Sequence, residues 1–184
     1  MRTLTRYGAI VLAATWLAGC SNTDPSDQLT QQQAISECGG FLITANMKSP
    51  LGDPATYCEA EMLHWAYNAS TQTLDLANNR MLLNCCGNHS INVSVEDGVY
   101  VISEVDAPEF ADARCGCMCV FDFTTTVQGI PEGVIPVRIV RDVTDAEGGP
   151  QVVYEGSLDL TAAVGSVELD PADVEPWCSG EVPQ

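Results

Sequence analysis

Basic residues are scarce in this sequence. Lysine and arginine together number 7, against 25 aspartates and glutamates, and the formal net charge is −18. Binding to nucleic acid phosphates requires clustered lysine and arginine, and an anionic lipid surface repels an acidic chain. The composition therefore makes nucleic acid a poor partner, and it is typical of a protein kept soluble outside the cell by its charge.

Motifs that carry catalysis are missing as well. The sequence contains no G-x-S-x-G, no H-E-x-x-H, no phosphate-binding loop and no G-x-G-x-x-G. Of its two histidines, His64 lies in an apolar segment and His89 follows a cysteine pair in a turn, and neither has a visible relay partner. We therefore expect a non-catalytic protein that uses no cofactor.

The one long apolar run lies near the N-terminus. Arg2 and Arg6 precede an apolar stretch at 9–17, which ends in Leu17-Ala18-Gly19-Cys20. A charged start, a short apolar core and small residues before a cleavage point are typical of a signal peptide. The run is too short to span a bilayer, which takes ~20 residues as a helix. It therefore predicts export.

The sequence Leu17-Ala18-Gly19-Cys20 resembles the lipobox of bacterial lipoproteins. The resemblance implies cleavage before Cys20, lipid attachment to its thiol, and a membrane anchor made of several acyl chains. Ser21 stands where a signal for retention in the inner membrane often has aspartate, which favours the outer membrane, on its periplasmic face or at the cell surface. An ordinary secretory signal is the alternative.

These features predict three parts. Residues 1–19 form the signal peptide, residues 20–34 the lipidated cysteine and a flexible tether, and residues 35–184 a single cysteine-rich β domain. The tether contains one large apolar residue, Leu29, and cannot bury enough surface to become ordered. The 165 residues left after cleavage suit one domain with a real core.

Strand patterns dominate the rest of the chain. Ile91, Val93 and Val95 alternate with polar residues, and Asp97-Gly98 is a two-residue turn signal before 99–105, so a β-hairpin is predicted there. Further strands are predicted at 62–67, 73–77, 81–85, 115–127, 134–143 and 152–160, with turns at 78–79 and 145–150. The pattern predicts a mainly β fold, a disulfide-stapled antiparallel β-sandwich of the immunoglobulin-like kind.

Cysteine, by contrast, is abundant. With Cys20 assigned to lipid, an even number remains in an exported chain, where disulfides persist. The disulfide candidates are Cys38, Cys58, Cys85, Cys86, Cys115, Cys117, Cys119 and Cys178.

Spacing narrows the possible pairs. Cys115, Cys117 and Cys119 share one face of the predicted strand, at intervals of ~6.5–7 Å. Disulfide Cα separations rarely exceed ~6.8 Å, so bonds within this row would be strained. Cys85 and Cys86 end a predicted strand, and a bulge or turn could present both to the row. We therefore predict two bonds between this pair and the row.

Three further cysteines complete the predicted framework. The assignment leaves Cys38 for Cys58, and Cys178 for the third member of the row. Each bond is expected to add ~2–4 kcal/mol, mainly by restricting the unfolded chain.

Metal binding is the competing interpretation. Zn²⁺ takes thiolate and imidazole ligands, and Cu(I) favours thiolates. The residues concerned are Cys85, Cys86, His89, Cys115, Cys117 and Cys119. Their C-C and C-x-C-x-C spacings differ from the C-x-x-C of common zinc knuckles, and an oxidising compartment removes free thiols. The missing C-x-x-C also weakens a redox role, so structural disulfides are the preferred reading.

Two acidic features stand out from the general acidity. Asp142, Asp145 and Glu147 crowd a predicted turn in which Ca²⁺ could find oxygen ligands, although the spacing does not match an EF-hand loop. Asp122 lies mid-strand, opposite the cysteine row, where one interpretation is an exposed outer face. The other is a buried carboxylate, for which Arg138 or Arg141 on a neighbouring strand could supply hydrogen-bond donors.

A longer motif, which includes the cysteine pair and the cysteine row, also resembles known proteins. Asn84-Cys85-Cys86, a hairpin, then Cys115-x-Cys117-x-Cys119-Val120-Phe121-Asp122 and Ile130-Pro131-Glu132-Gly133 resembles a group of small secreted or lipid-anchored bacterial proteins. The resemblance spans residues 79–160. It implies a shared disulfide-stapled β domain and no particular activity. We therefore expect a lipid-anchored binding or structural module whose ligand is a protein or a glycan.

Overall fold

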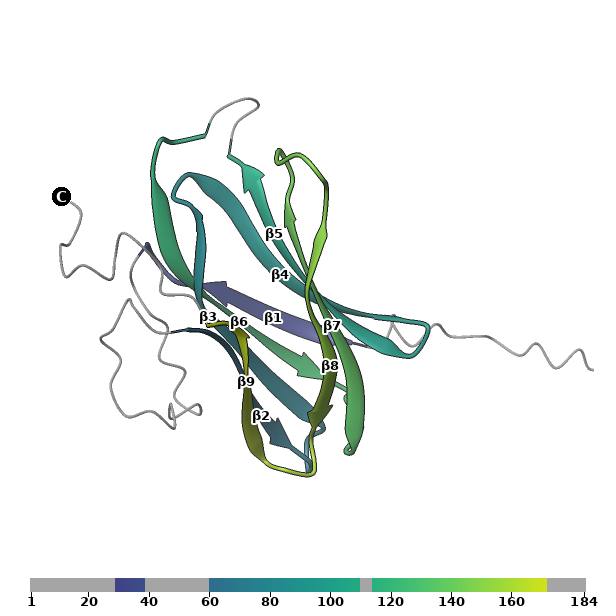
Figure 1. Ribbon diagram of the computed structural model, residues 1–184. Coiled ribbons are helices and arrows are strands. Elements are labelled where there is room, and N and C mark those ends of the chain that lie inside the picture. The colour runs from purple at the N-terminus through teal and green to yellow at the C-terminus, as the bar shows by residue number, and fades with distance from the viewer. Residues whose placement is uncertain (1–28, 39–59, 110–113, 172–184) are drawn as a thin grey trace, which may run out of the picture.

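The computed structural model describes residues 29–38, 60–109 and 114–171. Within these ranges the chain forms nine strands and no helix (Figure 1). The strands are β1 Thr30–Ile35, β2 Glu61–Asn68, β3 Thr73–Asn84, β4 Gly87–Glu96, β5 Val99–Pro108, β6 Met118–Gln128, β7 Val134–Val143, β8 Gln151–Asp159 and β9 Val164–Asp170.

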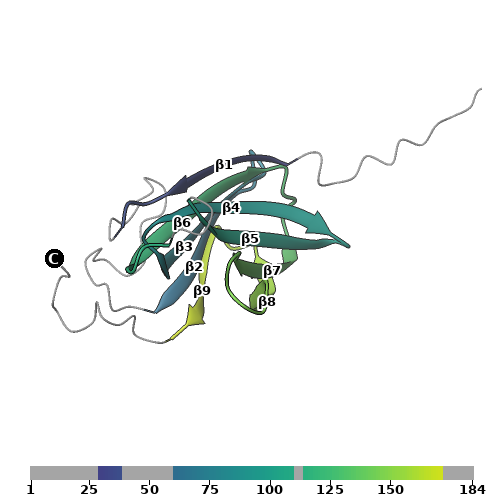
Figure 2. The same ribbon diagram turned by 90° about the horizontal axis from the view of Figure 1, so that it is seen from above.

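The strands form two sheets, which confirms the mainly β, disulfide-stapled fold (Figure 2). One sheet has the order β1-β6-β3-β2-β9 and the other the order β4-β5-β7-β8. All pairs are antiparallel except β5 with β7. These two are parallel because β6, which lies between them in the chain, belongs to the other sheet. Antiparallel pairing was expected throughout, and this one pair departs from it.

The hairpin predicted around Asp97-Gly98 is confirmed. β4 and β5 pair antiparallel, with Glu96 opposite Val99. Asp97 and Gly98 both have positive φ, at 49° and 81°, as a type I′ turn requires. That turn matches the twist of the flanking strands, so the local sequence is sufficient to specify this hairpin.

The turn predicted at Asn78-Asn79 is wrong. β3 runs through this position without interruption, and its register against β6 shifts between Asn78 and Met81. Arg80 has φ 69°, so the extra residue forms a β-bulge. Asparagine favours turns and bulges alike, which is why the pattern was read as a chain reversal.

All of β1 except Ile35 lies in the segment 20–34 that the sequence assigned to the flexible tether. It pairs antiparallel with β6, and two glutamines also bind the outer edge of β4. The Val93 amide donates to Gln31 Oε1 at 2.8 Å, Gln31 Nε2 donates back to the Val93 carbonyl, and the Ile91 amide donates to Gln33 Oε1 at 2.9 Å. Backbone pairing and carboxamide bonds therefore hold the polar part of this strand, while Leu29 before it and Ile35 at its end pack against the core.

The core fills the space between the sheets. The predicted alternation along β6 holds from Cys119 onward, because Cys119, Phe121, Phe123 and Val127 all enter the core. Apolar residues of the other strands join them, among them leucines of β2, β3 and β8 and isoleucines of β4, β5 and β7. Of the three cysteines in the row, Cys119 therefore lies in the core, whereas Cys115 and Cys117 do not belong to it.

A buried polar network joins the two sheets across this core. Asn78 in β3 donates to Glu61 of β2 at 2.9 Å and to Glu104 of β5 at 2.5 Å. Arg141 in β7 binds both carboxylates, with Nη1 3.1 Å from Glu61 Oε2 and Nη2 2.8 Å from Glu104 Oε2. Glu104 is 1% exposed, and its burial raises its pKa even though Arg141 opposes that shift. Two acidic groups thus share one guanidinium in the interior.

Asp122 is buried, so the alternative of an exposed outer face is wrong, and the hydrogen-bond donor differs from the arginines predicted for a buried carboxylate. Its Oδ1 accepts a hydrogen bond from the Arg80 backbone amide at 3.0 Å. Arg138 pairs instead with Glu155, and Arg141 belongs to the network between the sheets. Asp122 therefore fixes the β-bulge of β3, since it binds the amide of the residue with positive φ.

Candidate functional site

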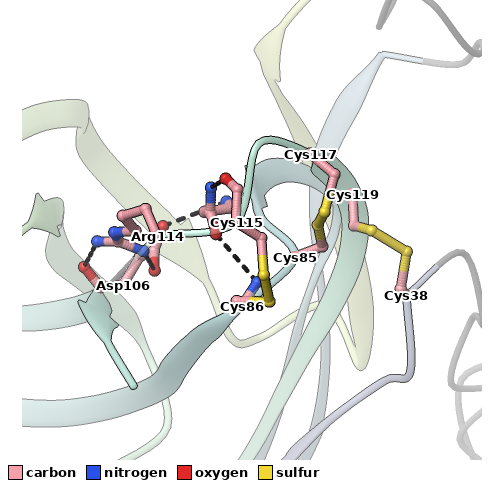
Figure 3. Close-up of a disulfide and its surroundings, with 9 residues drawn as sticks. Cys38, Cys85, Cys86, Asp106, Arg114, Cys115, Cys117 and Cys119 are labelled. Atoms are coloured by element: carbon pink, nitrogen blue, oxygen red, sulfur yellow. Dashed lines mark hydrogen bonds and ion pairs between the residues drawn. A yellow bond between two sulfur atoms is a disulfide. The ribbon is translucent and has the colours of Figure 1, made fainter. Parts of the chain in front are cut away.

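The six cysteines within the described residues lie close together in three disulfides (Figure 3). Cys85 is bonded to Cys117 and Cys86 to Cys115, with Cα separations of 5.7 Å and 5.4 Å. These two bonds confirm the prediction that the adjacent pair would join the row. Both links connect the same two segments and form a double clasp, a name we use below for Cys85–Cys117 together with Cys86–Cys115.

The third bond corrects two predictions. Cys38 is bonded to Cys119, not to Cys58, and no member of the row is left for Cys178. The reason lies in β1, whose pairing with β6 sets Ile35 opposite Phe123 and brings the residues after β1 alongside the start of β6. Cys58 and Cys178 lie outside the described residues, as does Cys20.

Local turns allow both adjacent cysteines to face the row. Cys85 and Cys86 lie between β3 and β4 rather than within a strand, and β6 begins only at Met118. The Asn84 side chain bridges the two segments: its Oδ1 accepts from the Cys86 amide at 3.0 Å, and its Nδ2 donates to the Cys115 carbonyl at 2.8 Å. A regular strand would have turned one of the adjacent cysteines away.

The thiolate metal site is not formed in this structure. All five cysteines of that interpretation are in disulfides, so none offers a thiolate. His89, the sixth proposed ligand, packs on Phe121 with ring centroids 4.5 Å apart. Among the described residues, no three His, Cys, Asp or Glu side chains are grouped to hold an ion. Asp145, considered as a calcium ligand, binds Arg114 instead.

A pocket of about 240 Å³ lies beside the double clasp. Its lining combines apolar side chains with two carboxylates and one guanidinium. The residues are Leu82, Leu83, Asn84, Asp106, Arg114, Met118, Val143, Asp145 and Ala146.

Arg114 is the centre of charge in this pocket (Figure 3). It forms ion pairs with Asp106 and Asp145, its Nε donates to Asp145 Oδ2 at 2.9 Å, and its Nη2 donates to the Asp106 carbonyl at 3.0 Å. Hydrogen bonding from Arg114 holds the pKa of Asp145 below its usual range. Sequence reasoning missed this arrangement, because a single arginine at the end of an acidic loop carries no spacing signal.

His89 approaches the same carboxylate from the other side. Its Nε2 lies 3.3 Å from Asp106 Oδ1, an ion-pair distance without hydrogen-bond alignment. Burial lowers the pKa of His89, and the Asp106 charge partly offsets that shift. A Cβ on Gly87 would stand 2.4 Å from Asp106 Oδ1, so only glycine leaves room for this contact. The other histidine, His64, is buried in β2.

Comparison with known proteins does not assign the chain to a family. No protein-family model matches the chain, and no curated protein or solved structure is significantly similar to it. The part of the chain that the structure describes contains no helix able to span a membrane.

Proposed function

We propose that this protein is a lipid-anchored module of the bacterial envelope, attached through Cys20, whose disulfide-clasped end binds a partner without catalysing a reaction. The observation that carries the proposal is the pocket of about 240 Å³ around Arg114, whose walls are held by the double clasp. The three disulfides support an oxidising compartment outside the cytoplasm, and the lipobox-like sequence supports anchoring to the outer membrane.

The charges of the pocket favour binding over catalysis. Arg114 occupies both carboxylates, so neither is poised to exchange a proton with a substrate. At about 240 Å³ the pocket is smaller than the ~300–1,000 Å³ of most small-molecule sites. Met118, 46% exposed, lies at its edge and offers an adaptable apolar contact. A side chain from a protein partner fits this space better than a free small molecule.

Replacing Cys20 with serine tests the anchor. We expect the variant to lose palmitate labelling completely and to move from the membrane fraction to the soluble fraction, because its thiol would otherwise carry the lipid. The β domain should keep its thermal unfolding midpoint, since Cys20 precedes every described strand. A Cys20→Ser chain that still incorporates palmitate and stays with membranes would refute this part of the proposal.

Site-specific photocrosslinking tests the pocket. A crosslinking residue at Met118 should give a discrete protein adduct in intact cells, and the adduct should weaken at least tenfold when Arg114→Met is added. Val164, 67% exposed at the start of β9, is the matched control and should give none. Equal adducts from both positions, or an adduct indifferent to Arg114, would contradict a binding site at this end.

A further inference from the structure

The members of the double clasp differ in their access to solvent. Cys117 is exposed and its partner Cys85 is half-buried, whereas Cys86 and Cys115 are both half-buried. Cys117 also precedes β6 and follows Gly116, around whose Cβ position no atom lies within 4 Å. A thiol from solvent can therefore reach the Cys117 sulfur more readily than either sulfur of the neighbouring bond.

Cys85–Cys117 also differs from Cys38–Cys119 in the sulfur that would leave during exchange. Thiol–disulfide exchange is faster when the expelled sulfur is stable as a thiolate. Cys38 is also exposed, but attack there would expel Cys119, which is 5% exposed within the apolar core, where a thiolate is unfavourable. Attack on Cys117 expels Cys85, which packs against the edge of the core but is only partly buried, so its thiolate is closer to water than that of Cys119.

We propose that Cys85–Cys117 is a thiol–disulfide exchange site that opens while the other two disulfides stay closed. The attacking group is the thiolate of a low-molecular-weight thiol or of a protein cysteine. It forms a new S–S bond to Cys117 as the old bond breaks, and Cys85 leaves as a thiolate that takes a proton from water. A second thiol then attacks the mixed disulfide, so two thiols are oxidised to one disulfide and Cys85–Cys117 is reduced to two thiols.

Opening this bond would loosen the pocket without separating the chain segments. Asn84, Arg114 and Met118 line the pocket, and each is adjacent in sequence to a cysteine of the double clasp. Cys86–Cys115 would still connect the two segments. The bond thus acts as a redox control on the pocket. This consequence rests on the proposed binding function, whereas the exchange chemistry does not.

Differential alkylation of the intact, lipidated wild-type protein tests the exchange site. The protein is incubated with graded glutathione in one arm and graded reduced thioredoxin in the other, alkylated, digested and mapped by mass spectrometry. We expect Cys85 and Cys117 to become labelled together at a glutathione concentration at least tenfold below that needed for the other four bonded cysteines. Labelling with thioredoxin alone would assign the same site to protein thiols.

Two results would overturn the proposal. One is earlier labelling of Cys86–Cys115 or Cys38–Cys119, and the other is simultaneous labelling of all six in a single unfolding transition. Hydrogen exchange of a Cys85→Ser/Cys117→Ser double variant tests the pocket separately. Amides at 82–84 and 143–146 should exchange at least tenfold faster than in wild type, while those of the 91–102 hairpin stay unchanged. Unchanged amide exchange rates at the pocket would overturn the redox control of the pocket, even if the alkylation experiment confirms that Cys85–Cys117 is the exchange site.

Discussion

Replacing Arg141 with methionine is expected to lower the free energy of unfolding by about 3–5 kcal/mol. The guanidinium is the cation that Glu61 and Glu104 share between the two sheets, and these residues are 6% and 1% exposed. Methionine replaces the aliphatic part of the side chain but leaves the two buried carboxylates without the guanidinium. Urea unfolding under non-reducing conditions measures the loss.

Arg138→Met is the matched control for this variant. Arg138 lies on the same strand, but its ion pair with Glu155 is largely exposed, with side-chain exposures of 35% and 64%. Exposed pairs contribute about 0–1 kcal/mol, so this variant should stay within about 1 kcal/mol of wild type. Equal effects of the two substitutions would show that the buried network does not stabilise the interface between the sheets.

The loss of unfolding free energy in Arg141→Met, called the deficit below, should also depend on pH. Burial already raises the pKa of Glu104 above its ordinary value of 4.5, and removing Arg141 takes away a charge that opposes this shift. A group with a raised pKa binds protons more tightly when folded, so its ionisation costs stability as pH rises above about 4.5. The deficit should therefore shrink as pH falls from 7 towards 4.5. A deficit independent of pH would contradict this assignment.

Removing the Cys38–Cys119 bond should have an effect of similar size. The bond closes a separation of 81 residues, and the chain-entropy relation gives about 4.5 kcal/mol for such a loop. Cys86–Cys115 has a separation of 29 residues, for which the same relation gives about 3.6 kcal/mol in isolation, but Cys85–Cys117 still closes the same loop when Cys86–Cys115 is removed, so the loss should be well below that value. A Cys38→Ala/Cys119→Ala variant should therefore unfold at lower denaturant than Cys86→Ala/Cys115→Ala.

Burial adds to this difference between the two disulfides. Cys119 lies in the core, so alanine there also removes packed sulfur, whereas Cys86 and Cys115 are half-buried. Equilibrium denaturation of the two double variants, each with its remaining disulfides oxidised, gives the comparison. The reverse order of stabilities would mean that loop length and core burial do not govern these bonds.

Local rules predicted the parts of this fold that depend on neighbouring residues. Asp97-Gly98 specifies its own hairpin through two residues with positive φ, and alternation along β6 places Phe121 and Phe123 in the core. Spacing also predicted that two bonds would join Cys85 and Cys86 to the row, although not which members of the row they use. Each of these features depends on the pleat and on turn geometry, which a short stretch of sequence encodes.

Other features depend on contacts between distant segments, which no local pattern carries. β1 is polar and forms through bonds between Gln31 and Gln33 and the edge of β4, so low apolar content gave the wrong expectation and also hid the partner of Cys38. Glu61 and Glu104 resemble surface residues in the sequence, yet Arg141 and Asn78 make their burial possible.

The pocket was missed for the same reason. Asp106 lies in β5, Arg114 between β5 and β6, and Asp145 between β7 and β8, and only the fold brings them together. Their individual positions in acidic loops look like ordinary solvated turns. To predict the pocket, one would have to choose which of the many carboxylates pairs with a single arginine. One sequence gives no basis for that choice.

The number of cysteines predicts one further disulfide. Six cysteines are paired among the described residues, and the lipid attachment that we propose would take Cys20, which would leave Cys58 and Cys178. β2 begins at Glu61 and β9 ends at Asp170, and these two residues are partners across the sheet. The segments that contain the two cysteines therefore join the sheet at neighbouring points. We expect them to bond to each other.

Intact mass of the natively isolated protein tests the central claim that the mature domain is held by paired cysteines. Alkylation in denaturant without reductant should add no label, and alkylation after reduction should add eight labels, one for each cysteine other than Cys20. Any label taken up before reduction, above all on Cys85, Cys86, Cys115, Cys117 or Cys119, would contradict the account.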